Sequence, residues 1–166
     1  MFEKFYPDIY IDSVFELPLD LFAEKGVRAL VFDIDNTLTP YDEAYPDSSI
    51  VELIAFLSDK GFKPMILSNN NRERVHKYNS RLRIPAVFKG GKPGTKKLMK
   101  LLASSGESPK TAAFIGDQIF TDVLCGHNAG MLSVYVHPIC ERDQLITKVK
   151  RPLDKIVLDE YFKKMY

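Results

Sequence analysis

The stretch VFDIDNTLTPY, residues 31–41, places two aspartates at the end of an apolar run. One residue separates Asp33 from Asp35, and a turn-forming segment with Pro40 follows them. The run before Asp33 is mostly apolar and includes the β-branched Val27 and Val31, which is typical of a buried strand. Two like charges at the mouth of a buried strand repel each other unless a cation or protons neutralise them. The stretch therefore leaves three alternatives: a solvated turn, a metal site, or a nucleophile accompanied by its own acid.

Apolar runs alternate with amphipathic segments along the rest of the chain. Strands are predicted at 27–34, 62–68, 86–88, 111–117 and 132–138, and helices at 19–26, 49–61, 71–82, 94–106, 119–130 and 154–164. Helix 49–61 is expected to begin at an N-cap of Ser48 or Ser49, because serine side chains satisfy free N–H groups there. Strands that alternate with helices in this way predict βαβ units and a Rossmann-like, three-layer α/β/α domain with a mainly parallel sheet.

Length and composition indicate one globular unit. The chain has 166 residues, of which 45% are hydrophobic, and it is expected to form a single domain over 1–166 with a core at about 27–140. The N- and C-terminal extensions are expected to pack on that core. No apolar run approaches the ~20 residues of a transmembrane helix, and the acidic N-terminus does not resemble a secretory signal. Cys125 and Cys140 are too few for a disulfide framework and suggest buried or half-buried thiols in a cytoplasmic protein.

Polar residues recur where the predicted strands end. Strand 27–34 carries Asp33, strand 62–68 ends in Ser68 with Asn69 behind it, and strand 111–117 ends in Asp117. The segment after the short strand 86–88 supplies Lys89 and Lys92. Ligands of open parallel sheets bind at the carboxyl ends of the strands. We therefore expect these side chains to meet at one edge of the sheet.

Three carboxylates at one edge, from Asp33, Asp35 and Asp117, call for a cation. A set of hard oxygen ligands without His or Cys suits Mg²⁺. The Ser68 hydroxyl and one lysine would then complement a phosphoryl group. An ionised carboxylate can attack phosphorus to give an aspartyl-phosphate, and a second carboxylate can move the proton.

At this point the residues match a known pattern. The sequence resembles the haloacid dehalogenase (HAD) superfamily of phosphotransferases, subfamily IIIA, in its YqeG-type group, which is similar to phosphatidylglycerophosphate phosphatases. The four motifs occur in order and span most of the chain. They read DIDNT from Asp33, LSN around Ser68, GGKPG around Lys92, and IGDQIFTD with Asp117 and Asp122.

The resemblance implies a role for each matching residue. Asp33 would be the nucleophile and a Mg²⁺ ligand, and Asp35 the general acid/base whose backbone carbonyl also reaches the metal. Ser68 and Asn69 would bind the phosphoryl group together with Lys92, and Asp117 would be the third protein ligand of the metal. Thr37 would stabilise the turn after the first strand, and Asp122 would act as a weaker metal ligand or orient Lys92. The dehalogenases of the superfamily lack the second aspartate, so Asp35 argues for a phosphatase.

The spacing of the motifs leaves no room for a cap domain. One helix fills most of the segment between Asp35 and Ser68, and one helix with a short strand fills that between Ser68 and Lys92. The site is therefore expected to be open, guarded only by the loop TPYDEAYP at 39–46. An open site suits a bulky or surface-presented phosphorylated substrate, such as a lipid head group, a nucleic acid end or a protein.

Charge is unevenly distributed along the chain. Residues 72–100 contain ten basic residues and one acidic residue, Glu73, whereas the rest of the chain carries 13 basic and 21 acidic residues. This asymmetry favours contact with an anionic partner, although solvated helix faces give the same pattern. Besides the phosphatase, two other functions fit: a phosphoacceptor switch, and a protein that binds RNA or the ribosome through the 72–100 block. A peripheral contact with a membrane is compatible with the phosphatase, and contact with nucleic acid is the weaker candidate.

Overall fold

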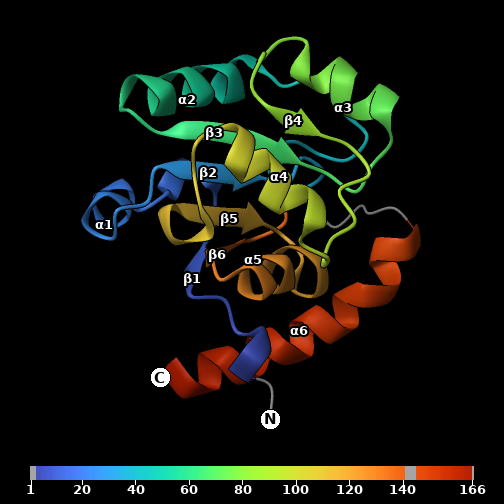
Figure 1. Cartoon of the computed structure of the whole chain (residues 1–166). Helices are drawn as coiled ribbons and strands as arrows, with labels where there is room; N and C mark the ends of the chain where they lie inside the picture. The colour runs from blue at the N-terminus through green and yellow to red at the C-terminus, as the bar shows by residue number, and fades with distance from the viewer. Residues whose placement is uncertain (1–2, 141–144, 166) are drawn as a thin grey trace.

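The computed structural model describes residues 3–140 and 145–165, with side chains from 149 onward in the last helix. A six-stranded sheet forms the centre, its strands in the order β1-β6-β5-β2-β3-β4, and every neighbouring pair is parallel (Figure 1). The strands are β1 (Ile9–Ile11), β2 (Ala29–Phe32), β3 (Lys63–Leu67), β4 (Ala86–Val87), β5 (Ala112–Gly116) and β6 (Leu132–Val136). The α/β class with a parallel sheet is thereby confirmed.

Helices cover both faces of the sheet. They are α1 (Leu19–Glu24), α2 (Ser48–Asp59), α3 (Arg72–Asn79), α4 (Lys96–Ser104), α5 (Leu124–Ala129) and α6 (Leu145–Met165). Helices α1, α2 and α3 share one hydrophobic cluster with the sheet, and α4 and α5 share another on the opposite face. Helix α6 runs along the β1 side of the molecule (Figure 1).

The central strand β2 is buried on both faces. Leu30 and Phe32 belong to the cluster under α2, whereas Ala29 and Val31 belong to the cluster under α4. All four side chains are fully buried, which explains why the sequence of this strand is continuously apolar and does not alternate between apolar and polar residues. Each fully buried large apolar side chain stabilises the fold by about 1.5–3 kcal/mol. This packing fixes the end of β2, from which Asp33 projects.

Strand register brings the predicted site residues together. Strand β2 pairs with β3 on one side and with β5 on the other, with Phe32 opposite both Ile66 and Ile115. The backbone N–H of Asp33 donates to Ile115 O at 3.0 Å, one step beyond the strand. Ser68 and Asp117 directly follow β3 and β5, so three adjacent strands deliver polar residues to one edge.

The N-terminal segment contributes a strand that the sequence pattern did not predict. Strand β1 pairs with β6, with Tyr10 opposite Tyr135, and the rings of these two tyrosines stack at 5.6 Å between centroids. Strand β1 thus joins the N-terminal segment to the edge of the sheet. The added strand is short, and its stability depends on the neighbouring β6 and on aromatic contacts, so local sequence carries little sign of it.

Two local predictions are wrong in detail. Helix α2 is capped by Asp47, whose Oδ1 accepts from Ile50 N at 3.0 Å, and not by Ser48 or Ser49. A carboxylate at the N-cap also interacts favourably with the helix dipole, which explains the choice. The predicted helix 119–130 begins as a π-helical turn at Ile119–Val123 before α5. Such turns occur often at functional sites.

The connections around the site contain no cap. A loop and α2 link β2 to β3, and α3 and β4 fill the chain between β3 and Lys92. The cysteines are placed as predicted, Cys125 buried and Cys140 half-buried. Within the part of the chain that the structure describes, no helix has the length and apolarity needed to cross a bilayer.

Helix α6 is held to the rest of the molecule by a small cluster and a buried carboxylate. Val157 packs with Ile119, Val123 and Tyr135. Asp154 is only 2% exposed, and neither carboxylate oxygen has a hydrogen-bond partner among the described residues. Burial raises the pKa of Asp154 to about 7, against the nearby guanidinium of Arg151.

The raised pKa makes the packing of α6 sensitive to pH. Below about pH 4 the carboxyl is protonated in both the folded and the unfolded state, whereas between pH 4 and 7 only the folded state keeps the proton. Stability therefore falls as the pH rises through this window. Asp154→Asn should remove that fall, so its stability advantage over wild type should grow to about 1–3 kcal/mol at pH 8.

Denaturant melts of both proteins at pH 4.5 and pH 8 test this. Asp159→Asn, which removes an exposed carboxylate from the same helix, is the matched control and should give the same small difference at both pH values. A stability difference for Asp154→Asn that does not grow with pH would contradict the prediction.

Candidate active site

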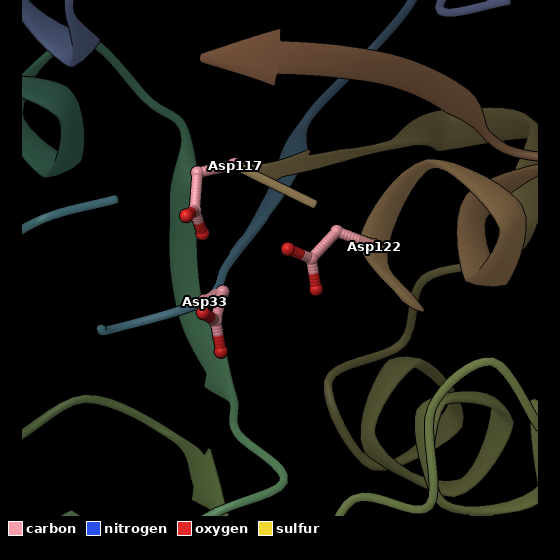
Figure 2. A group of neighbouring side chains, drawn as sticks. All are labelled: Asp33, Asp117 and Asp122. Carbon is pink, nitrogen blue, oxygen red and sulfur yellow. The ribbon is translucent and has the colours of Figure 1, made fainter. Parts of the chain in front are cut away.

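Three buried carboxylates lie together at the carboxyl edge of the sheet. One oxygen from each of Asp33, Asp117 and Asp122 lies within 4.8 Å of the others. Figure 2 shows them converging from three segments: the ends of β2 and β5 and the π-helical turn before α5. Their exposed fractions are 4%, 0% and 1%, so solvent screens little of their mutual repulsion.

Lys92 offsets part of this charge. Its Nζ donates to Asp33 Oδ1 and to Asp122 Oδ1, each at 2.7 Å, and the side chain is 3% exposed. Burial acts to lower the pKa of Lys92, but the carboxylates of Asp122 and Asp33 outweigh it and raise the pKa above its usual value. The lysine is therefore charged at neutral pH. The structure brings Lys92 to the nucleophile predicted from the sequence, and the rival Lys89 is exposed.

The loop that carries Lys92 is fastened to the end of β3. Asn69 Oδ1 accepts from Lys92 N at 2.8 Å, and Asn69 Nδ2 donates to Lys92 O at 3.1 Å. The predicted phosphate-binding residue Asn69 thus uses its amide group to hold the Lys92 backbone. Ser68 is 1% exposed, and its Oγ accepts from Asn70 N at 3.1 Å. Ser68 Oγ lies in the turn that follows β3, next to the loop of Lys92.

Gly116 lets Asp122 approach the end of β5. A Cβ atom at position 116 would lie 2.4 Å from the side chain of Asp122, closer than side-chain atoms pack. Asp122 Oδ2 accepts from Gln118 N at 3.1 Å, and this bond holds the first residues of the π-helical turn. Glycine in the IGD segment is therefore required by the packing of a carboxylate against the backbone.

Asp117 is held by two groups from distant parts of the chain. Thr37 Oγ1 donates to Asp117 Oδ1 at 2.9 Å, so Thr37 ties the first motif to the fourth. Arg151, on α6, donates from NH1 to Asp117 O at 2.6 Å and from NH2 to Asp117 Oδ2. Burial raises the pKa of Asp117 to about 6, although Arg151 and Thr37 act to lower it.

Asp35 lies apart from the three clustered carboxylates. Its Oδ1 accepts from Arg74 Nε at 3.2 Å and NH2 at 2.9 Å, and its Oδ2 accepts from Asn70 Nδ2 at 3.0 Å. The two aspartates of the first motif thus contact different groups. Asp33 faces Lys92 and the carboxylate cluster, whereas Asp35 faces the beginning of α3.

The carboxylate cluster fits a divalent cation. Burial, with added repulsion from Asp122 and Asp117, raises the pKa of Asp33 well above its usual value despite Lys92. A site that holds three buried carboxylates against one lysine and one arginine gains by binding a positive ion. Its donors are all hard oxygens, which suits Mg²⁺ better than a softer metal. Asp33 and Asp117 are suited to hold such an ion, and Asp122 stays bonded to Lys92.

The sequence analysis assigned no role at this edge to three residues: Asn70, Arg74 and Arg151. Asn70 directly follows the second motif, so its position was a usable signal. Arg74 was counted only as part of the basic 72–100 block. Arg151 lies 34 residues beyond Asp117, and no local pattern distinguishes it from the other basic residues of α6.

Comparisons with known proteins agree with the geometry. Residues 2–140 match the family model described as mitochondrial PGP phosphatase. The chain is 30% identical over 159 residues to a probable phosphatase, YqeG, of Bacillus subtilis, covering 95% of this chain and 92% of the relative.

Solved structures with the same fold are more distant in sequence. A HAD phosphatase from Thermococcus onnurineus matches with a TM-score of 0.56 and 14% identity, covering 76% of this chain and 98% of that one. The cobalt-bound form of the deoxy-D-mannose-octulosonate 8-phosphate phosphatase YrbI from Haemophilus influenzae also gives 0.56 at 14% identity, covering 81% and 89%. At this identity the likeness supports the fold alone.

Because Lys92 is buried between Asp33 and Asp122, we expect the stability of the fold to depend strongly on its positive charge. Lys92→Met leaves Asp33 and Asp122 without their shared cation, which should cost about 3–5 kcal/mol in the metal-free protein. Added Mg²⁺ should restore more stability to this variant than to wild type, because the cluster has lost its own positive charge. Thermal melts in EDTA and in MgCl₂ measure both effects.

Two further variants serve as controls. Lys96→Met removes an exposed lysine and should change the melting temperature little. Lys92→Met combined with Asp122→Asn removes one carboxylate as well and should recover part of the loss. Equal melting of Lys92→Met and wild type in EDTA would contradict the argument.

Proposed function

We propose that this chain, which belongs to the mitochondrial PGP phosphatase family and is a phosphatase of the HAD type, hydrolyses phosphate monoesters through an aspartyl-phosphate on Asp33. The support comes from one observation above all. The nucleophile candidate Asp33 shares a buried lysine with Asp122 and adjoins Asp117. Lys92 acts to lower the pKa of Asp33 against the larger effect of burial, and a bound cation would complete the neutralisation that an ionised nucleophile needs.

Asp33, Asp117 and the backbone carbonyl of Asp35 are the proposed Mg²⁺ ligands. When bound, Mg²⁺ would neutralise carboxylate charge and draw electron density from the phosphoryl oxygens. Lys92 would contribute a fixed positive charge between nucleophile and phosphoryl group. The Ser68 hydroxyl and the backbone N–H of Asn69 would donate hydrogen bonds to the phosphoryl oxygens, while Asp122 keeps Lys92 in place.

The reaction then takes two displacements. In the first, an oxygen of Asp33 attacks phosphorus, the ester P–O bond breaks, and Asp35 gives its proton to the departing alcohol oxygen. In the second, water attacks phosphorus and gives a proton to Asp35, which releases phosphate and restores Asp33. Thr37 holds Asp117 throughout by its hydroxyl bond. A phosphoacceptor switch would not carry an acid/base such as Asp35 two residues after its phosphorylated aspartate. Hydrolysis is therefore the favoured hypothesis.

The substrate is proposed to be a large phosphomonoester, with phosphatidylglycerophosphate as first candidate. The name of the matching family supports this choice, and so does the short cover over the site. Among the described residues no cap domain covers the carboxylate edge, and the loop at 39–46 is its expected cover. A small metabolite would be poorly enclosed there. A cytoplasmic protein that meets its substrate at a membrane surface is the corresponding proposal for location.

A substrate screen tests this function. Purified protein with Mg²⁺ should turn over phosphatidylglycerophosphate in detergent micelles well above soluble sugar phosphates and nucleotides. Asp33→Asn should lower the rate by at least about 10³-fold, since the amide cannot form the acyl-phosphate. Phosphate release, measured for each ester, is the readout.

Asp159→Asn, an exposed change far from the site motifs, should keep full activity and is the control. A wild-type protein that releases no phosphate from any ester with Mg²⁺ would contradict the proposed reaction. A preference for a small soluble ester would contradict only the proposed substrate.

The basic 72–100 block divides between the site and the surface. Lys92 is buried and Arg74 half-buried, each bonded to an aspartate of the first motif. The other eight form what we call the basic surface, over α3, the β4 edge and α4. Its members are exposed: Arg72, Lys77, Arg81, Arg83, Lys89, Lys96, Lys97 and Lys100. Lys89 N donates to Asn70 O at 2.8 Å, so this surface reaches the site.

The basic surface is proposed to meet anionic lipid. Protein should bind vesicles that contain phosphatidylglycerol and not neutral vesicles, and binding should weaken as salt is raised. Lys96→Glu with Lys100→Glu should lower vesicle binding by at least about tenfold, because each basic residue near the surface adds about 1 kcal/mol. Vesicle flotation gives the bound fraction.

Lys25→Glu with Lys110→Glu makes the same change in net charge at exposed positions outside the basic surface and is the matched control. Equal loss of binding in both double variants would show that only net charge matters. Binding to RNA but not to anionic vesicles would favour the nucleic acid alternative.

A further inference from the structure

A second ion pair lies beside the carboxylate cluster, between Asp35 and α3. Arg74 donates two hydrogen bonds to Asp35 Oδ1, and Asn70 donates one to Asp35 Oδ2. The side chains of Arg74 and Asp35 are 13% and 18% exposed, so this pair is better shielded than a surface salt bridge. With donors on both oxygens, the Asp35 carboxylate is held in one orientation.

Arg74 is itself fixed by the beginning of α3. Its backbone N–H donates at 2.9 Å to the side chain of Asn71, which caps the helix. Its guanidinium packs over the ring of Tyr78, 5.3 Å from the ring centroid, and Tyr78 is fully buried. A capped helix and a buried ring thus hold the arginine that holds Asp35.

The pair adjoins a hollow on the surface. This hollow, of about 260 Å³, lies between residues 41–44 and α3, and Arg74 and Lys77 line its α3 side. Tyr45 keeps the two walls together, because Lys77 and Arg81 both pack against its ring, at 5.4 and 4.4 Å from the centroid. The opposite wall carries Asp42 and Glu43. Charged walls of both signs suit a hydroxylated, polar group better than an apolar one.

We propose that Arg74 is a positioning residue for the acid/base Asp35, and that the alcohol part of the ester lies in the hollow beside it. The inference rests on the proposed function. In the first displacement the P–O bond to the alcohol breaks, its electron pair stays on the alcohol oxygen, and Asp35 supplies the proton. That oxygen must lie within hydrogen-bond reach of Asp35, and the hollow is the adjoining space.

The contacts indicate which oxygen of Asp35 moves the proton. Oδ1 accepts two bonds from a cationic guanidinium, which are stronger than a bond from a neutral amide. Among the residues that the structure describes, Oδ2 accepts from the neutral amide of Asn70 alone, which is the weaker bond. Oδ2 is therefore the oxygen that moves the proton, and Arg74, which lines the hollow, fixes the orientation of the carboxyl group.

Leaving-group dependence separates this role from a structural one. p-Nitrophenolate leaves without protonation, whereas an alkyl alkoxide does not. Arg74→Gln should therefore lower kcat for an alkyl ester, phosphatidylglycerophosphate or glycerol 3-phosphate, by about 10²-fold, the lower end of what general acid catalysis contributes. The same variant should lower kcat for p-nitrophenyl phosphate by less than about fivefold. Arg74→Lys, which keeps the charge but not the fork of two N–H groups, should recover part of the alkyl-ester rate.

Lys25→Gln is the control, because Lys25 is exposed, lies outside the basic surface and does not line the hollow. It should leave both rates close to wild type. Thermal melts of all variants establish that they are folded. Asn70→Ala should reproduce the selective loss in weaker form, since it removes the bond to Oδ2.

Two results would overturn the inference and leave the proposed function intact. Equal losses on both esters in Arg74→Gln would show that Arg74 supports the site only as a whole. Faster turnover of the alkyl ester would show that Arg74 holds Asp35 away from the leaving group. Wild-type protein inactive on both esters would contradict the proposed function, and the role of Arg74 with it.

Discussion

The site depends on the bridge that Lys92 makes between Asp33 and Asp122. Both bonds are 2.7 Å long and buried, so the lysine offsets one of the two negative charges without help from water. Isolated carboxylates at these depths would take up protons. The lysine acts against this, and the loop that carries it is held in turn by Asn69. The third motif thus delivers part of the counter-charge that a carboxylate at the end of a buried strand needs.

The parallel sheet explains how motifs far apart in sequence meet. Strand β2 lies between β3 and β5, and all three run the same way. Residues that follow these strands must therefore appear at one edge. The Thr37 bond to Asp117 then joins segments 80 residues apart, so the ends of β2 and β5 are tied together by a side-chain bond as well as by the sheet. Electrostatic catalysis depends on such fixed positions, because groups that are already oriented need no reorganisation during the reaction.

Much of this could be predicted from the sequence, because strand burial and turn residues are local signals. The ends of β2, β3 and β5, and with them Asp33, Ser68 and Asp117, follow from apolar runs that stop at polar residues. The parts that could not be predicted depend on contacts across the fold. Strand β1 forms only because β6 offers its edge, and the π-helical turn only because Asp122 must reach both Gln118 and Lys92.

Arg74 and Arg151 illustrate the same limit at the site. Each is one basic residue among many, and neither has a pattern that separates it from a solvated side chain. Their partners, Asp35 and Asp117, belong to the motifs that could be recognised. Asp33 and Asp117 directly follow strands, and their positions are therefore constrained by the sheet. Arg74 and Arg151 come from α3 and α6, outside the sheet. The proposed chemistry therefore depends on the sheet, whereas the hollow proposed for the alcohol part of the substrate lies outside it, between residues 41–44 and α3.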